Sequence, residues 1–266
     1  MVFFFELYTY IILYIIYIKH SYEQINENIL FTGRITAYGI SESKNKKLGE
    51  IAMNGNCAFT HLTEFVMGPK NYLFVALNQF QYEYNPNGYG INCGRCIEIQ
   101  CNNFTSCPNK KVDALITDRC PECPKYALDL SPNIWNIVTG KTYGISQVKW
   151  KFIECNPNTK EPLIFQTISY YWKNESNIWS SNLQFRNFKK GIRKMILKDN
   201  NGKIIDSSKF PNNNLLAGGN FYFKINNVKF PLIITLYNVV DALSIQFRIL
   251  RQIRPTFEIF TSVQFS

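Results

Sequence analysis

The stretch that decides the fold is TDRCPECPKYALDLS, residues 117–131. An apolar, β-rich run, Val112–Asp118, ends at Asp118, which is the first aspartate of the quoted stretch. A helical segment is expected to begin near the second aspartate of the stretch, Asp129. Ser131-Pro132 is a usual helix start, and Gly140 is a usual helix end. Because strand ends and loops commonly carry functional side chains, the stretch predicts two carboxylates at one site.

Length, composition and charge limit the classes of protein to which the chain can belong. The 266 residues suit two domains of roughly 100–150 residues each. Apolar residues make up 46% and charged residues 18%, which excludes a disordered, highly charged tail protein. Residues 1–159 carry a net charge of +1 and residues 160–266 carry +9. The basic half predicts an acidic partner, or else only a solubilising surface.

All eight cysteines lie between Cys57 and Cys155, which predicts a disulfide framework formed in an oxidising compartment. A competing interpretation is a zinc ribbon, because 23 residues separate two CxxC pairs, Cys93/Cys96 and Cys120/Cys123. Residues 1–20 are predicted to be a signal peptide whose apolar run LYTYIILYIIYI covers 7–18. The alternative is an uncleaved N-terminal membrane anchor. The protein is therefore expected to be secreted.

Short β-rich runs separated by turn residues follow residue 30. Residues 156–159 (NPNT) read as a linker. The expected strands are Gly33–Tyr38, Tyr72–Leu77, Cys96–Cys101, Val112–Asp118, Gln147–Glu154, Leu163–Ser169, Leu183–Arg186, Lys194–Lys198, Phe221–Ile225, Leu232–Tyr237 and Ile245–Leu250.

Four side chains are candidates for one groove. Thr36 and Tyr38 come from an early strand, and Asp118 and Asp129 come from the stretch quoted above. Two carboxyl groups in a groove are what most glycosidases use to cleave a glycosidic bond. The alternative is that both aspartates are merely loop and cap residues.

The chain resembles the expansin family. The resemblance lies in the segments GRITAYG (33–39), GNCAF (55–59), CGRCIEI (93–99), residues 117–131, and WSSNLQFRN (179–187), in family order. The likeness is nearest to the expansin-like proteins of cellulose-making amoebae. The His-Phe-Asp motif of plant expansins reads Ala127-Leu128-Asp129 here, so only the aspartate is kept.

This resemblance implies an all-β chain. Residues 31–155 would form a six-stranded double-psi β-barrel, 156–162 a linker, and 163–266 an immunoglobulin-like, carbohydrate-binding β-sandwich. Family members loosen cellulosic walls without hydrolysing them, and Asp129 stands at the position on which they depend most. The resemblance also implies the disulfides Cys57–Cys93 and Cys101–Cys107, and Cys96–Cys155 and Cys120–Cys123 would then remain.

Catalytic hydrolysis is not expected. An inverting glycosidase needs an acid and a base on opposite faces of the sugar. Related glycosidases place the base just after the tyrosine of the first strand, but here Gly39 and Ile40 follow Tyr38. Asp118 could replace that base, and a lytic transglycosylase needs one aspartate, so an enzyme remains the alternative. A purely structural matrix lectin is the third hypothesis.

In the second half, Trp179 matches the binding position of the family, whereas Ile178 and Asn212 stand where further aromatic platforms are expected. Tyr171 and Trp172 could substitute, or could lie in the core. Lys173 is predicted to bind polysaccharide with the basic cluster around it, and Asn103 and Asn174 begin N-glycosylation sequons. The expected partners are cellulose and acidic or matrix polysaccharides. No nucleic acid, protein partner, cofactor or metal is expected, and the protein is expected to be a monomer.

Overall fold

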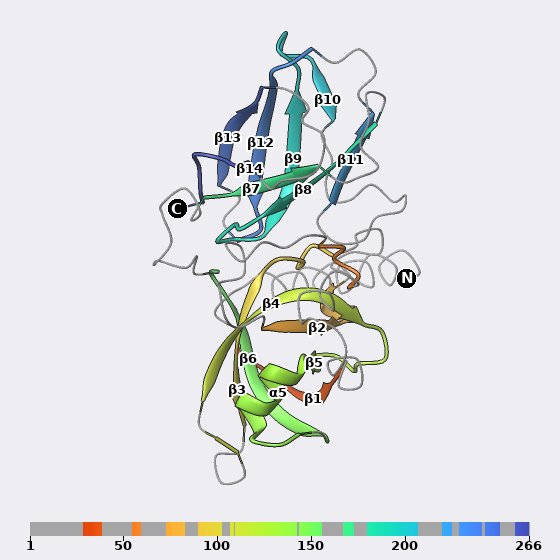
Figure 1. Cartoon of the computed structure of the whole chain (residues 1–266), viewed down its shortest axis with the longest axis vertical. Helices are drawn as coiled ribbons and strands as arrows, with labels where there is room; N and C mark the ends of the chain where they lie inside the picture. The colour runs from red at the N-terminus through yellow and green to blue at the C-terminus, as the bar shows by residue number, and fades with distance from the viewer. Residues whose placement is uncertain are drawn as a thin grey trace, which may run out of the picture.

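A computed structural model describes residues 29–38, 55–59, 73–82, 90–102, 107–108, 110–142, 144–155, 167–172, 180–206, 220–224, 229–240, 243–250 and 259–265. Six strands of the first half form a closed barrel in the order β1-β5-β2-β4-β3-β6 (Figure 1). Strand β1 pairs in parallel with β5, and β2 pairs in parallel with β4, while the other neighbours are antiparallel. The strands are β1 Phe31–Ala37, β2 Phe74–Asn78, β3 Cys96–Cys101, β4 Lys111–Cys120, β5 Leu128–Leu130 and β6 Ser146–Ile153.

Alternating side chains fill the barrel. In β6, Val148, Trp150 and Phe152 are fully buried, while the residues between them are less buried or exposed. Phe31 packs on Trp150 with ring centroids 4.6 Å apart, and the indole N–H of Trp150 donates to the carbonyl of Tyr126 at 2.8 Å. This period of two is what a strand with one apolar face requires.

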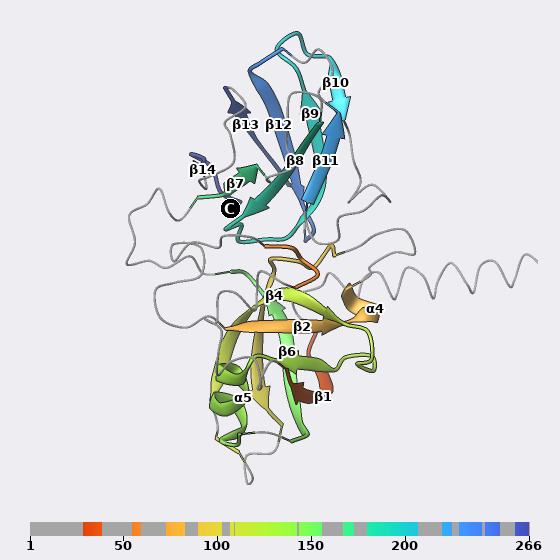
Figure 2. The same ribbon diagram turned by 45° about the vertical axis from the view of Figure 1, so that its right-hand side comes forward.

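Helix α5, Pro132–Thr139, begins and ends at the predicted signals. Gly140 has a left-handed backbone (φ 68°), and its N–H donates to the carbonyl of Asn136 at 2.8 Å. Ile134, Trp135 and Val138 are buried in the same apolar cluster as the barrel strands. Figure 2 shows α5 lying against the barrel. A second helix, α4 Gln79–Tyr82, follows β2.

The structure corrects the expected position of Asp129. This residue does not begin a helical segment but lies at the centre of β5. Three residues form a strand here because β5 has a partner on each side, β1 and β2, so that both edges of its backbone are paired.

The second half contains two four-stranded sheets, β10-β9-β12-β13 and β11-β8-β7-β14 (Figures 1 and 2). Side chains of both sheets share one apolar core, which confirms the all-β barrel-plus-sandwich fold. The strands are β7 Ser169–Trp172, β8 Ser180–Arg186, β9 Ile192–Lys198, β10 Ile204–Asp206, β11 Asn220–Lys224, β12 Leu232–Asn238, β13 Ser244–Ile249 and β14 Ile259–Phe260.

Trp172 belongs to this core, whereas Tyr171 is buried outside that cluster, with the Arg186 guanidinium carbon 4.6 Å from its ring centre. Tyr171 and Trp172 are 2% and 1% exposed, so neither is a surface platform for sugar. Of the predicted strand Leu163–Ser169, residues 163–166 lie outside the described ranges, Thr167 and Ile168 are not in a strand, and Ser169 begins β7, whose four residues are all buried.

A buried junction joins the barrel to the sandwich. Gln184 of β8 donates to the carbonyl of Cys57 at 3.0 Å, and Cys155 N–H donates to the carbonyl of Lys189 at 2.9 Å. A side chain at Gly191 would meet the Cδ of the buried Arg95 at 2.6 Å, so only glycine allows this approach. The two halves are therefore packed together rather than only tethered.

Several sequence-based predictions fall on parts of the chain outside the described ranges. These are the leader (1–20), the linker (156–162), Lys173, Trp179, Asn103 and Asn174. The domain boundaries stay a prediction. Within the described residues, no helix is long and apolar enough to cross a membrane.

Candidate functional site

The candidate groove is built on a row of residues that crosses four neighbouring barrel strands. Thr36 in β1 lies beside Asp129 in β5, Asp129 lies beside Ala76 in β2, and Ala76 lies beside Asp118 in β4. Ala76, Cys120, Cys123 and Ala127 form a small apolar cluster separate from the barrel core, and Tyr38 packs against it. All four predicted groove residues are therefore brought together. Whether they act on a ligand stays a proposal.

Asp129 is half-buried and held by Thr36, whose hydroxyl donates to Oδ1 at 2.7 Å. Burial raises the pKa of Asp129 above its ordinary value, and the carboxylates of Glu122 and Asp118 raise it further, while the Thr36 hydrogen bond opposes the change. The neutral acid is thus favoured here more than in water. Asn78 fixes the chain just before β5, because its side-chain amide donates to the carbonyl of Ala127 at 3.1 Å.

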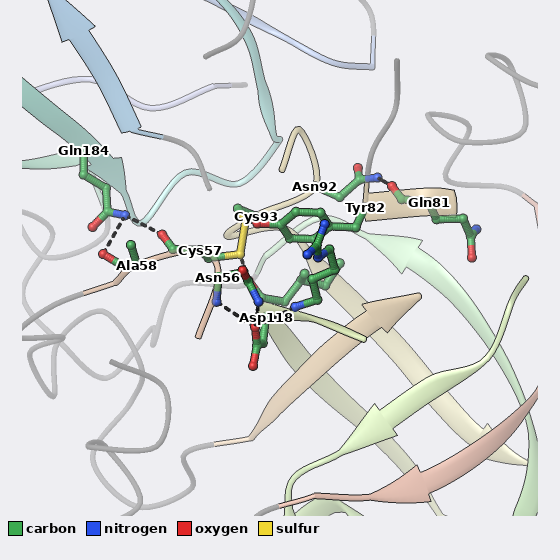
Figure 3. The surroundings of a disulfide bond; sticks show 11 residues. Asn56, Cys57, Ala58, Gln81, Tyr82, Asn92, Cys93, Asp118 and Gln184 are labelled. Carbon is green, nitrogen blue, oxygen red and sulfur yellow. Dashed lines mark hydrogen bonds between the residues drawn. A yellow bond between two sulfur atoms is a disulfide. The ribbon is translucent and has the colours of Figure 1, made fainter. Parts of the chain in front are cut away.

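Asp118 is held by three N–H donors on one oxygen. Its Oδ1 accepts the backbone and side-chain N–H groups of Asn56, at 2.6 and 2.8 Å, and the backbone N–H of Arg119 at 2.7 Å. Figure 3 shows Asn56 meeting Asp118 beside the Cys57–Cys93 disulfide. Gly55 allows this approach, since a Cβ there would lie 2.5 Å from the carbonyl of Thr117.

Tyr38 lies beside both aspartates. Burial raises the pKa of its phenol, and the charges of Asp118 and Asp129 add to that increase. Tyr38 is therefore a neutral phenol at any physiological pH, able to donate one hydrogen bond and to offer an aromatic face.

Glu122 is a candidate that reasoning from the residues did not place in the groove. It lies on the exposed loop that the Cys120–Cys123 disulfide closes, and its carboxylate lies within 4.8 Å of that of Asp129. The two cysteines around it are the only local signal, since a three-residue separation forces a tight loop. The group Cys120, Glu122 and Asp129 does not fit a metal ion, because the sulfur of Cys120 is bonded to Cys123 and offers no thiolate.

The two aspartates of the row differ in position and in how they are held. Asp118 and Asp129 stand two strands apart, a backbone separation of about 10 Å. Inverting glycosidases hold their two carboxyl groups roughly 6.5–9.5 Å apart with a free base. Asp118 is instead fixed by donors on Oδ1, so one lone-pair region that a base needs is already occupied.

The structure contains four disulfides. Two are the pairs that the resemblance implies, Cys57–Cys93 and Cys101–Cys107, and two are the pairs expected to remain, Cys96–Cys155 and Cys120–Cys123. No cysteine is left free. The zinc-ribbon interpretation is therefore wrong for this structure, because both CxxC pairs are consumed in sulfur–sulfur bonds.

Known proteins with similar sequences are expansins. Expansin-YoaJ of Bacillus subtilis is 31% identical over 110 residues, which cover 41% of this chain and 44% of the relative. Expansin-B6 of Arabidopsis thaliana is 31% identical over 93 residues, which cover 35% of this chain and 30% of the relative. The matched segment thus spans less than half the length of these relatives. No family model matches the chain.

The fold has close counterparts among solved structures. The apo expansin of Clavibacter michiganensis superposes with a TM-score of 0.65 at 17% identity, over 89% of this chain and 98% of the other. A mutant of that expansin in complex with cellohexaose superposes with a TM-score of 0.63 at 18% identity. These relatives are bacterial and plant proteins, so the nearer likeness to amoebal proteins stays a prediction. Sequence and fold together confirm the resemblance of this chain to the expansin family.

Proposed function

We propose that this chain is a secreted, non-hydrolytic, expansin-like protein that binds cellulose and matrix polysaccharide and loosens their non-covalent contacts. The observation that carries the proposal is the state of Asp129. It lies half-buried in the row across the barrel strands, is positioned by Thr36, and stands two strands from an Asp118 that N–H donors already hold. The cellohexaose bound to the mutant of a protein with this fold supports a glucan as ligand.

The mechanism would be differential binding. Asp129 and Tyr38 would hydrogen-bond sugar hydroxyls and hold a single glucan in a pose that differs from the one it has when packed against other chains. If the protein binds a separated glucan more tightly than a packed one, it shifts the equilibrium between the two forms toward the separated glucan. The size of the shift is set by the difference in binding free energy. Under load, contacts that open are then prevented from closing, and no covalent bond changes.

An extracellular wall or sheath is the proposed setting. Four disulfides within the barrel suit an oxidising compartment, and the predicted leader at residues 1–20 would direct the chain there. Within the family, the second half would retain the protein on polysaccharide, with Trp179 as its aromatic platform.

The test compares Asp129→Asn with a matched control, Asp113→Asn, on stretched cellulose paper. Asp113 is also an aspartate of a barrel strand whose pKa burial raises, but it lies in β4 beside Glu98, outside the row. A charge-assisted hydrogen bond contributes about 1.5–3 kcal/mol, so loosening by Asp129→Asn should fall roughly ten- to a hundredfold. The control should loosen normally. Full activity in Asp129→Asn would refute the assignment.

An enzyme is the second candidate, because a second carboxylate, that of Glu122, lies within 4.8 Å of Asp129. Glycosidase or lytic transglycosylase activity would release reducing ends or shortened chains from the same paper, and Asp129→Asn would abolish that release. A matrix lectin, the third candidate, would bind the paper without changing its creep under load.

A further inference from the structure

One outer face of the sandwich combines cations with apolar side chains. It belongs to the sheet β10-β9-β12-β13 (Figure 1). In β9, Met195 and Leu197 point into the core and are fully buried, so the residues that alternate with them point outward. We call this surface the basic sheet face; its principal residues are Lys194, Ile196, Lys198, Ile233, Tyr237 and Arg248.

The strand register places these residues in rows. Lys198, Ile233 and Arg248 form one row across β9, β12 and β13, and Lys194 lies beside Tyr237 in another. The side-chain amine of Lys194 lies 5.4 Å from the centre of the Tyr237 ring. From strand geometry, Lys194 and Lys198 stand about 13 Å apart along β9, and Lys198 and Arg248 about 10 Å apart across two strands.

The charged residues of the described strands β9, β12 and β13 are all basic, while the edge strand β10 contains Asp206. Strands β9, β12 and β13 contain no aspartate or glutamate. In the described part of the chain, no carboxylate forms an ion pair with Lys194, Lys198 or Arg248. A face that only keeps a protein soluble would intersperse both signs of charge. On this face, two isoleucines and a tyrosine lie between basic side chains that form no ion pair with a described carboxylate, so apolar area is flanked by groups that can bind anions.

We propose that the basic sheet face binds an acidic polysaccharide. The half-exposed Ile196, Ile233 and Tyr237 offer apolar area to the C–H faces of the sugars, and Lys194, Lys198 and Arg248 pair with carboxylates along the polymer.

The inference rests on the proposed function only for its setting in a polysaccharide matrix. The probe is sodium polygalacturonate, measured by affinity electrophoresis with the full chain across a salt series. The face variant is Lys198→Gln/Arg248→Gln. Its matched control, Lys141→Gln/Lys149→Gln, removes the same charge from exposed barrel positions.

We expect the face variant to bind polygalacturonate roughly 30-fold more weakly at low salt, as two lysine or arginine contacts with an anionic surface imply. Its binding should also depend less on salt. The control should change binding less than twofold. An equal loss in both double variants would mean that net charge alone attracts the polymer and would overturn the proposal. An unchanged affinity of the face variant would overturn it as well.

A second variant tests the apolar area of the face. Tyr237→Ser should weaken the binding that persists at high salt and leave the salt dependence unchanged, whereas binding indifferent to Tyr237 would exclude a shaped site. Loosening of pure cellulose paper separates this proposal from the proposed function. The face variants should loosen it normally, whereas Asp129→Asn should not, yet should bind polygalacturonate as before.

Discussion

The junction between barrel and sandwich should depend strongly on one amide. Gln184 is completely buried, and its Nε2 donates to the carbonyls of Cys57 and Ala58 at 3.0 and 3.4 Å. Its Oε1 accepts Nε and Nη2 of the buried Arg186, at 3.1 and 2.8 Å. Figure 3 shows the amide reaching the disulfide-bonded segment of the barrel. Gln184→Met keeps the length of the side chain and removes both polar groups.

The expected loss follows from these contacts. A neutral hydrogen bond contributes about 0.5–1.5 kcal/mol and a charged one about 1.5–3 kcal/mol, so the free energy of unfolding should fall by about 2–4 kcal/mol. Urea denaturation at neutral pH measures it, and a midpoint shift of roughly 1 M is expected for typical slopes.

The matched control is Gln246→Met, whose amide donates to Thr235 at 3.0 Å on an exposed surface. Exposed substitutions of this kind usually stay within about 0.5 kcal/mol. A midpoint shift in Gln184→Met no larger than that of the control would refute the role given to the junction.

Further predictions concern the groove and the disulfides. Because the folded protein raises the pKa of Asp129, ionising this carboxyl destabilises the fold. Asp129→Asn should therefore be more stable than the wild type at pH 7 in thermal melts, a gain that disappears as the pH falls below about 4. Gly55→Ala should displace Asn56 from Asp118 and reduce loosening with little change in cellulose binding, as a pull-down would show. Replacing Cys96 and its partner by serine should destabilise the protein more than replacing the Cys120 pair, because the loops span 59 and 3 residues; equal urea midpoints would contradict this.

Patterns that act over short distances in the chain were readable from the residues alone. Alternation identified strands such as β6, where Val148 and Trp150 alternate with exposed residues. The backbone needs of a helix end identified Gly140. Concentration of cysteines in one half predicted the disulfide framework, and the spacing of Asp118 and Asp129 indicated the groove. The strand and helix signals depend on neighbours only a few residues away, and the cysteine count depends on composition alone, so both can be read without knowledge of the fold.

Only the tertiary structure decided the rest. Asp129 lies in a three-residue strand because two distant strands pair with it, and Glu122 joins it because a disulfide bends its loop. Gln184 is buried because a barrel segment 127 residues away covers it. The basic sheet face exists because β9, β12 and β13 pair in one register. Such features arise from contacts between segments that are remote in the sequence. Local periodicity does not encode these contacts, because they form only when the chain folds and brings the segments together.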